Sequence, residues 1–182
     1  MEEQAGPRGR LDLDRIKRAH DERREELAGS APPLTVRAIV RVVEDQLKEA
    51  RVGQFTFQSD ETAHLGGRGE APTPLAYFVA SVGFCLLTQY TRAAAIHGVP
   101  IDDLQIEVRA SFPVEWKYGL GEASSACDRL SYTLDVASPA PPERLVELLA
   151  WAERACHVVS TFREPVPVEV TLRHNGTAIR SE

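Results

Sequence analysis

Apolar and polar residues alternate one by one along five stretches of the chain, the pattern of β-strands with one buried face. These stretches are rich in β-branched and aromatic residues, which fit the pleated surface of a sheet. They cover residues 34–43, 53–59, 104–112, 129–136 and 166–173. We predict a strand at each, the first two forming the arms of a hairpin with a polar connection over residues 44–52.

Residues 74–97 have a different pattern, because the middle of this segment is apolar almost all round and rich in helix formers. Such a segment predicts a buried helix. Thr73 is a typical N-cap and Pro74 occupies the first helical position. Gly98 and Pro100 follow in the order that ends helices. At 1.5 Å per residue the helix would be about 35 Å long.

Two further helices are predicted. Residues 11–27 are dense in charges of both signs, which is typical of an exposed helix. The other helix follows the prolines after Ser138 and ends at Cys156-His157. Its apolar stripe recurs at helical spacing and consists of Leu145, Leu148, Leu149, Ala152 and Ala155.

The predicted element order is β-β-α-β-β-α-β, which is typical of an α+β fold with antiparallel sheets and helices packed on one face. We divide the chain into an N-terminal charged helical extension, residues 1–30, and one folded domain, residues 31–182. Residues 1–10 are predicted to be disordered, and residues 29–33 read as a linker.

Length and charge narrow the function classes. The chain has 182 residues, enough for one domain with an extension. Its net charge of −6 speaks against nucleic acid and anionic membranes as partners. No apolar leader follows Met1, and polar residues such as Ser81 and Arg92 interrupt the segment 74–97. We therefore expect a cytoplasmic protein without a membrane segment.

A glycine cluster lies in the predicted loop over residues 60–70. The residues Gly66-Gly67-Arg68-Gly69 lack the spacing and the flanking lysine of a phosphate loop. We therefore expect unusual backbone angles there and no nucleotide site.

The chain contains three cysteines: Cys85, Cys127 and Cys156. Three are too few, and odd in number, for a secreted disulfide framework. In a cytosolic protein they are buried fillers, metal ligands or redox thiols. If Cys85 and Cys156 meet in the fold, one thiolate could attack an oxidant and the other resolve the oxidised sulfur. The spacing alone is a weak signal for this chemistry, because a buried cysteine most commonly serves as a small hydrophobic filler.

The residues around these two cysteines resemble the OsmC/Ohr family of peroxide-detoxifying proteins. The resemblance rests on Gly66-Gly67, on the segments 72–75, 80–85 and 97–108, and on the second-cysteine segment 155–170. It covers roughly residues 34–174. It implies an OsmC-like fold and an intertwined homodimer in which six-stranded antiparallel sheets wrap two long central helices, with the active sites at the subunit interface.

The resemblance also implies a chemical cycle. Cys85 would be the peroxidatic thiolate and Cys156 the resolving thiol. An organic hydroperoxide would convert Cys85 to a sulfenate, a Cys85–Cys156 disulfide would follow, and a dithiol would reduce it. The cycle needs no cofactor and no metal.

The sequence departs from the family at two points. A glutamate of the family, which orients an arginine against the thiolate, is replaced here by Leu75. The arginine has no secure match; Arg51 fits best by position, with Arg68 and Arg37 as other candidates. These departures keep a second hypothesis open, an OsmC-fold binding protein for small molecules with weak or lost peroxidase activity.

Four residues of the long helix are candidates for substrate binding. Ser81 and Gln89 lie one turn before and after Cys85, so they could bind a peroxide or line a helix–helix contact. Tyr77 and Phe84 could line an apolar pocket or belong to the core. His157 could assist proton transfer, but the histidines and cysteines show no repeated metal-ligand spacing, and we expect no metal.

Overall fold

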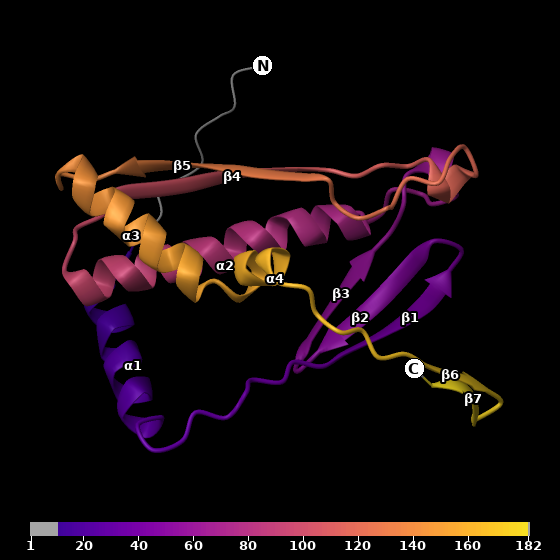
Figure 1. Ribbon diagram of the computed structural model, residues 1–182, viewed down its shortest axis with the longest axis horizontal. Coiled ribbons are helices and arrows are strands. Elements are labelled where there is room, and N and C mark those ends of the chain that lie inside the picture. Colours follow the sequence, from indigo (N-terminus) through magenta and orange to yellow (C-terminus); the bar gives the residue numbers. More distant parts are fainter. Residues whose placement is uncertain (1–10, 182) are drawn as a thin grey trace.

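The computed structural model describes residues 11–181 and has an α+β architecture (Figure 1). The helices are α1 (Leu13–Glu26), α2 (Pro74–His97), α3 (Pro142–Ala155) and α4 (His157–Arg163), with the 3-10 helices η1 (Ala63–Leu65) and η2 (Trp116–Tyr118). The strands are β1 (Ala38–Glu44), β2 (Leu47–Val52), β3 (Phe55–Ser59), β4 (Asp103–Ser111), β5 (Arg129–Ala137), β6 (Thr171–His174) and β7 (Thr177–Ser181). The predicted fold class is confirmed at this level.

Helix α2 has the predicted bounds and supplies the largest share of the buried core. The Thr73 hydroxyl accepts a hydrogen bond from the backbone N–H of Ala76 at 3.3 Å, which caps the helix. Gly98 ends it with a φ of 64°, a conformation that glycine adopts without strain. The buried cluster joins α2 to α3 and α4 and includes Val82, Leu86, Tyr90, Leu148, Ala152, Cys156 and Val159.

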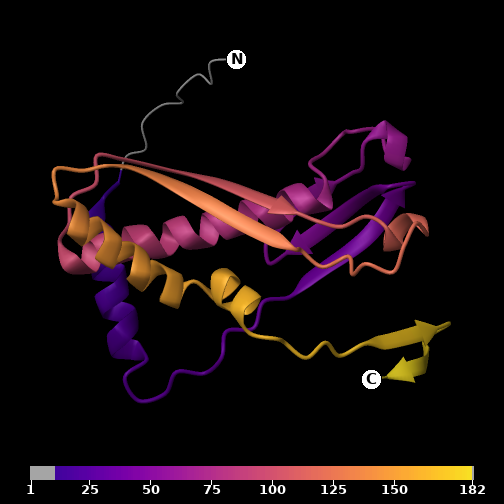
Figure 2. The ribbon, with the colours of Figure 1, turned by 45° about the horizontal axis from the view of Figure 1, so that its top comes forward.

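Strands β4 and β5 form an antiparallel hairpin that lies over α2 (Figure 2). Apolar residues pair directly across the two strands, Ile106 opposite Leu134 and Val108 opposite Tyr132, and such pairs stabilise a sheet. Helix α2 approaches the hairpin closely at Gly83, where an added Cβ would lie 3.2 Å from Cγ2 of Ile106. The missing side chain at position 83 therefore sets the distance between helix and hairpin.

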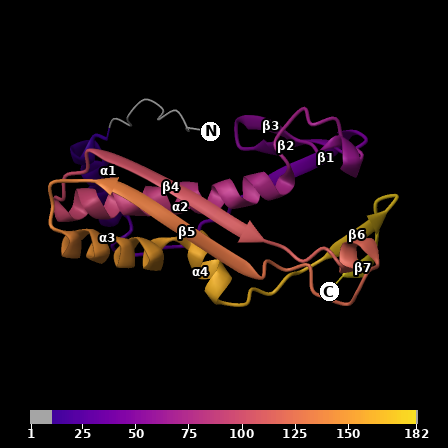
Figure 3. The ribbon, with the colours of Figure 1, turned by 90° about the horizontal axis from the view of Figure 1, so that it is seen from above.

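Helices α3 and α4 pack against α2 (Figure 3). Helix α1 also packs on α2, near its C-terminal end. The carboxylate of Asp12 accepts a hydrogen bond from the backbone N–H of Arg15 at 2.9 Å and so caps α1. The division into an extension and one domain stays a prediction, as does the disorder of residues 1–10, which lie outside the described part of the chain.

The prediction that residues 44–52 form a polar connection is wrong, because β2 occupies most of this segment. Strand β2 pairs with β1 on one side and β3 on the other, so β1 and β3 are not the two arms of one hairpin. Asp45 turns the chain with a φ of 47° and Gly53 turns it back with a φ of 57°. The strand was missed because β2 contains several charged residues. These residues pair across the sheet: Arg41 of β1 donates to Glu49 of β2 at 2.7 Å.

Two predictions near the C-terminus are also wrong in part. The second helix does not continue through Cys156-His157: α3 ends at Ala155, and the separate helix α4 follows. The final strand predicted over residues 166–173 is reduced to β6, which pairs with β7, while residues 166–170 have no regular structure. Strand β1 likewise begins at Ala38, four residues later than predicted.

Many large apolar side chains are exposed in this single chain. The prediction of a helix buried all round holds for one face of α2 and fails for the other, where Leu75 is 50% and Phe84 is 71% exposed. Strand β1 is exposed along its whole length. The sheet β1–β2–β3 lies at the N-terminal end of α2 and the hairpin β6–β7 lies beyond it, both away from α3 (Figure 1). Within residues 11–181, no helix combines the length and apolarity that crossing a membrane requires.

Candidate active site

The fold brings Cys85 and Cys156 together. Cys85 lies in the middle of α2 and is partly exposed, whereas Cys156 is fully buried between α3 and α4. Cys85 packs against the buried cluster that contains Cys156, the two thiols are close enough to interact, and both are unbridged. The third thiol, Cys127, lies in the loop before β5 and donates to the carbonyl of Arg129.

A break between two helices positions Cys156. Its φ of −81° and ψ of 108° are extended, so the chain leaves α3 and re-enters a helix at His157. The backbone N–H of Ser160 then donates to the Cys156 carbonyl at 2.9 Å, which closes the first turn of α4. The N–H groups of Val158 and Val159 interact with the Cys156 sulfur.

The surroundings of Cys156 favour its protonated form. Burial raises the pKa of this thiol, and the nearby Cys85 thiol raises it further, while the N–H groups of Val158 and Val159 act in the opposite direction. A thiol with a raised pKa is a poor nucleophile at neutral pH. Of the two sulfurs, the accessible one is therefore the better placed for attack on an external oxidant.

A polar network lies beside Cys156. The Tyr132 hydroxyl of β5 donates to Oε1 of Glu153 in α3, and Arg163 at the end of α4 donates to Oε2 of the same carboxylate at 3.1 Å. Burial, followed by the bond to Glu153, raises the pKa of Tyr132 to about 12. The bond from Tyr132 and the Arg163 cation hold the pKa of Glu153 below its usual value.

Sequence reasoning missed this network. Its members are distant along the chain and no motif contains them. One signal was present: Glu153 lies one helical turn before Cys156, where a carboxylate interrupts an otherwise apolar stripe.

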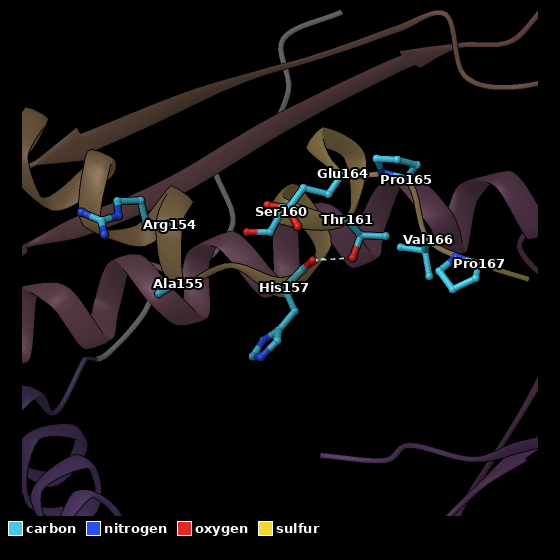
Figure 4. A pocket seen from close by; sticks show the side chains of 9 residues that line it. All are labelled: Arg154, Ala155, His157, Ser160, Thr161, Glu164, Pro165, Val166 and Pro167. Carbon is cyan, nitrogen blue, oxygen red and sulfur yellow. Dashed lines mark hydrogen bonds between the residues drawn. The ribbon is translucent and has the colours of Figure 1, made fainter. Parts of the chain in front are cut away.

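Two hollows border the helices that carry the thiols, and neither is lined by Cys85 or Cys156. A groove of about 770 Å³ runs between α2 and β4 and is lined mostly by apolar side chains, among them Leu75, Phe84 and Ile106. A more polar hollow of about 520 Å³ lies on the outer side of the α3–α4 break (Figure 4). There the Thr161 hydroxyl donates to the carbonyl of His157 at 2.7 Å.

Comparisons with known proteins show the family and the fold. The sequence model of the OsmC-like protein family matches residues 67–171, more than half of the chain and both cysteines. The chain belongs to the OsmC-like protein family.

Individual relatives are distant. An uncharacterized protein of Haloferax volcanii is 27% identical over 124 residues, which are 68% of this chain and 83% of that protein. An OsmC-like protein from Mycoplasma pneumoniae has a similar structure, with a TM-score of 0.64 and 17% identity over 74% of this chain and 91% of that one. An organic hydroperoxide resistance protein from Elizabethkingia anophelis gives a TM-score of 0.57 and 12% identity over the same shares. At these identities the structures show a common fold.

The candidate binding residues of this OsmC-like chain have other partners in the structure. Ser81 donates to the carbonyl of Phe78 in its own helix at 2.7 Å. Gln89 is buried, and its side-chain oxygen accepts from Arg92 at 3.2 Å. Tyr77 donates to the carbonyl of Gln58 at 2.6 Å and so ties α2 to β3. Their predicted roles in substrate binding stay predictions, as does that of Phe84 in the groove.

No arginine is bonded to the thiol pair within residues 11–181. Arg51 is exposed on β2, opposite Ile39 and Thr56. Arg68 donates to Glu44 at 2.6 Å, and this bond raises its pKa. The activating role of Arg51 therefore stays a prediction. The described residues also contain no group of three or more His, Cys, Asp or Glu side chains that could hold a metal ion.

Proposed function

We propose that this chain is a thiol-dependent peroxidase that reduces organic hydroperoxides. The observation that carries the proposal is the contact between an accessible thiol, Cys85, and a buried thiol, Cys156, in a member of the OsmC-like family. Three neighbours in structure are named hydroperoxide resistance proteins, which supports the choice of oxidant.

The first step is the attack of the Cys85 thiolate on the terminal peroxide oxygen. The O–O bond breaks, the alkoxide takes a proton and leaves as the alcohol, and Cys85 becomes a sulfenic acid. In the second step the Cys156 sulfur attacks this sulfenic acid, water leaves, and a Cys85–Cys156 disulfide forms. A dithiol then exchanges with the disulfide and restores both thiols while it is itself oxidised.

A steady-state assay tests the proposal. Cumene hydroperoxide and dithiothreitol are added, and peroxide loss is followed for the wild type and three cysteine variants. We expect Cys85→Ser to abolish turnover and Cys156→Ser to lower it at least about tenfold, since its sulfenic acid would lack an internal partner. Cys127→Ser is the matched control and should stay within about twofold of the wild type.

Two results would overturn the peroxidase proposal: wild-type peroxide loss no faster than in buffer, or unchanged loss in Cys85→Ser. The binding-protein hypothesis would then take its place. Leu75 at the position of the family glutamate and the apolar groove of about 770 Å³ favour that alternative. It predicts saturable binding of an apolar fluorescent probe that Phe84→Asp abolishes.

We further propose that the active molecule is an intertwined homodimer. The chain exposes 14176 Å² of surface, whereas a compact monomer of 20.1 kDa exposes about 8,700 Å². This excess of exposed surface is larger than the area that one partner buries in most obligate interfaces. It therefore favours two chains that are wrapped around each other. The uncovered apolar residues of β1, β6 and α2 supply the surface that a second copy would bury.

A further inference from the structure

We propose that Tyr132, Glu153 and Arg163 form a positioning network that holds Cys156 within reach of Cys85. The proposal deepens the peroxidase proposal, since it assigns control of disulfide closure to residues outside the cysteine motifs. The three residues are positioning residues: they act through Cys156 and do not touch the peroxide.

The network spans the helix break. Glu153 lies three residues before Cys156 in α3, and Arg163 lies seven residues after it at the end of α4. Their bond of 3.1 Å therefore closes a loop around the single extended residue that carries the thiol. Helix α4 has only seven residues, too few for a stable helix without such tertiary contacts.

The network also connects the break to the scaffold of Cys85. Tyr132 lies in β5 opposite Val108 of β4, on the face of the hairpin that packs on the core. Cys85 lies in α2, which packs against β4. Both carboxylate oxygens of Glu153 are used, one by Tyr132 and one by Arg163, so a single side chain joins the hairpin to both helices.

Burial decides which bond matters most. The Glu153 side chain is 26% exposed and that of Arg163 is 55% exposed, so the ion pair alone is partly screened by water. The bond between Tyr132 and Glu153 is partly buried, and burial is the main cause that raises the pKa of Tyr132. Removal of the Tyr132 hydroxyl should therefore make the α3–α4 break more mobile, although the substitution deletes a single atom.

The consequence concerns the second chemical step. Closure of a disulfide requires the two sulfurs to adopt a narrow range of distances and dihedral angles. A freely moving α3–α4 break would spread Cys156 over many positions and lower its effective concentration at Cys85. The peroxide step involves Cys85 alone and should not depend on the network.

The test measures the effective concentration of the two thiols without any peroxide. The reduced protein is equilibrated with mixtures of oxidised and reduced glutathione. Oxidised glutathione accepts two electrons from Cys85 and Cys156, so that the protein disulfide forms and two molecules of reduced glutathione are released. We expect Tyr132→Phe and Arg163→Met each to lower the equilibrium constant for the Cys85–Cys156 disulfide at least about tenfold. Arg163→Lys keeps a cation for Glu153 and should recover most of that loss.

Arg109→Met is the matched control. It removes an arginine that pairs with Glu107 at 2.7 Å on the exposed face of β4, and it should leave the equilibrium constant within about twofold. Melting temperatures are measured in parallel. A network that only stabilises the fold would lower the melting temperature and leave the equilibrium constant unchanged, which would overturn the proposal.

Tyr132→Phe decides the outcome if Arg163→Met does not fold, because phenylalanine keeps the packing of the ring. An equilibrium constant within about twofold of the wild type in folded Tyr132→Phe would overturn the proposal. Since the measurement uses glutathione, an absence of peroxide turnover in the wild type would sink the peroxidase proposal and leave this result readable.

Discussion

At the scale of single residues, the glycine cluster after β3 has a steric cause. Asp60 is buried, and its carboxylate accepts hydrogen bonds from the backbone N–H groups of Glu61, Arg68 and Glu70 at 2.8, 2.9 and 3.2 Å. Gly66 and Gly69 have positive φ angles, as the sequence led us to expect. The chain passes so close to itself that a Cβ at position 67 would lie 1.9 Å from the carbonyl oxygen of Glu61.

We therefore predict that Gly67→Ala destabilises the fold by at least about 2 kcal/mol, since backbone atoms have to move apart. Gly29→Ala is the control, because a Cβ there has no atom within 4 Å. Chemical denaturation of both variants checks the prediction. Equal stability of Gly67→Ala and the wild type would mean that the loop is not held in this conformation.

A second residue-scale prediction follows from the raised pKa of Cys156. The attack on the sulfenic acid needs the thiolate, and a thiol that titrates above its ordinary value of 9.0 is almost fully protonated at neutral pH. The rate of disulfide closure should therefore rise about tenfold per pH unit between pH 7 and 9. Stopped-flow measurement of the closure phase provides the check, and a plateau below pH 8 would show that burial does not control this thiol.

At the scale of elements, the sequence predicted those whose pattern is complete within one segment. The bounds of α2 followed from Thr73, Pro74 and Gly98, and the alternation in β4 and β5 marked their inward faces. Strand β2 was missed because it carries charged residues that pair across strands, as Glu49 does with Arg41 of β1. Such pairs cannot be read along one segment.

The thiol site shows the same limit. Cys85 and Cys156 were singled out from their flanking residues, and the structure brings them into contact. The break that places Cys156 was not predicted, because α3 and α4 carry no glycine or proline between them and the helical pattern runs on. The Tyr132–Glu153–Arg163 network requires β5 to lie beside α3. This arrangement is visible in the folded structure and cannot be predicted from any one segment of the sequence.

At the scale of the whole molecule, much of the exposed surface is apolar. Val40 and Val42 of β1 are 61% and 66% exposed, and Val168 before β6 is 80% exposed, in a protein of ordinary composition. Monomeric proteins rarely leave such a surface uncovered. We propose that a second copy of the chain covers it.

We predict that the protein elutes with about twice the mass of 20.1 kDa in size-exclusion chromatography with light scattering. Val40→Lys should weaken the dimer and shift the mass toward the monomer, because it places a charge in the buried interface. Glu122→Lys, in the exposed loop before β5, serves as the control. A folded, active monomer at micromolar concentration would refute the intertwined assembly.

The most direct test of the whole account is a single turnover followed by peptide mapping. The reduced protein is mixed with one equivalent of cumene hydroperoxide, its remaining thiols are alkylated, and the digest is analysed by mass spectrometry. We predict that the peptides of Cys85 and Cys156 are joined with the loss of two hydrogen atoms and that Cys127 is alkylated. Recovery of both cysteines as alkylated thiols after exposure to the peroxide would contradict the central claim.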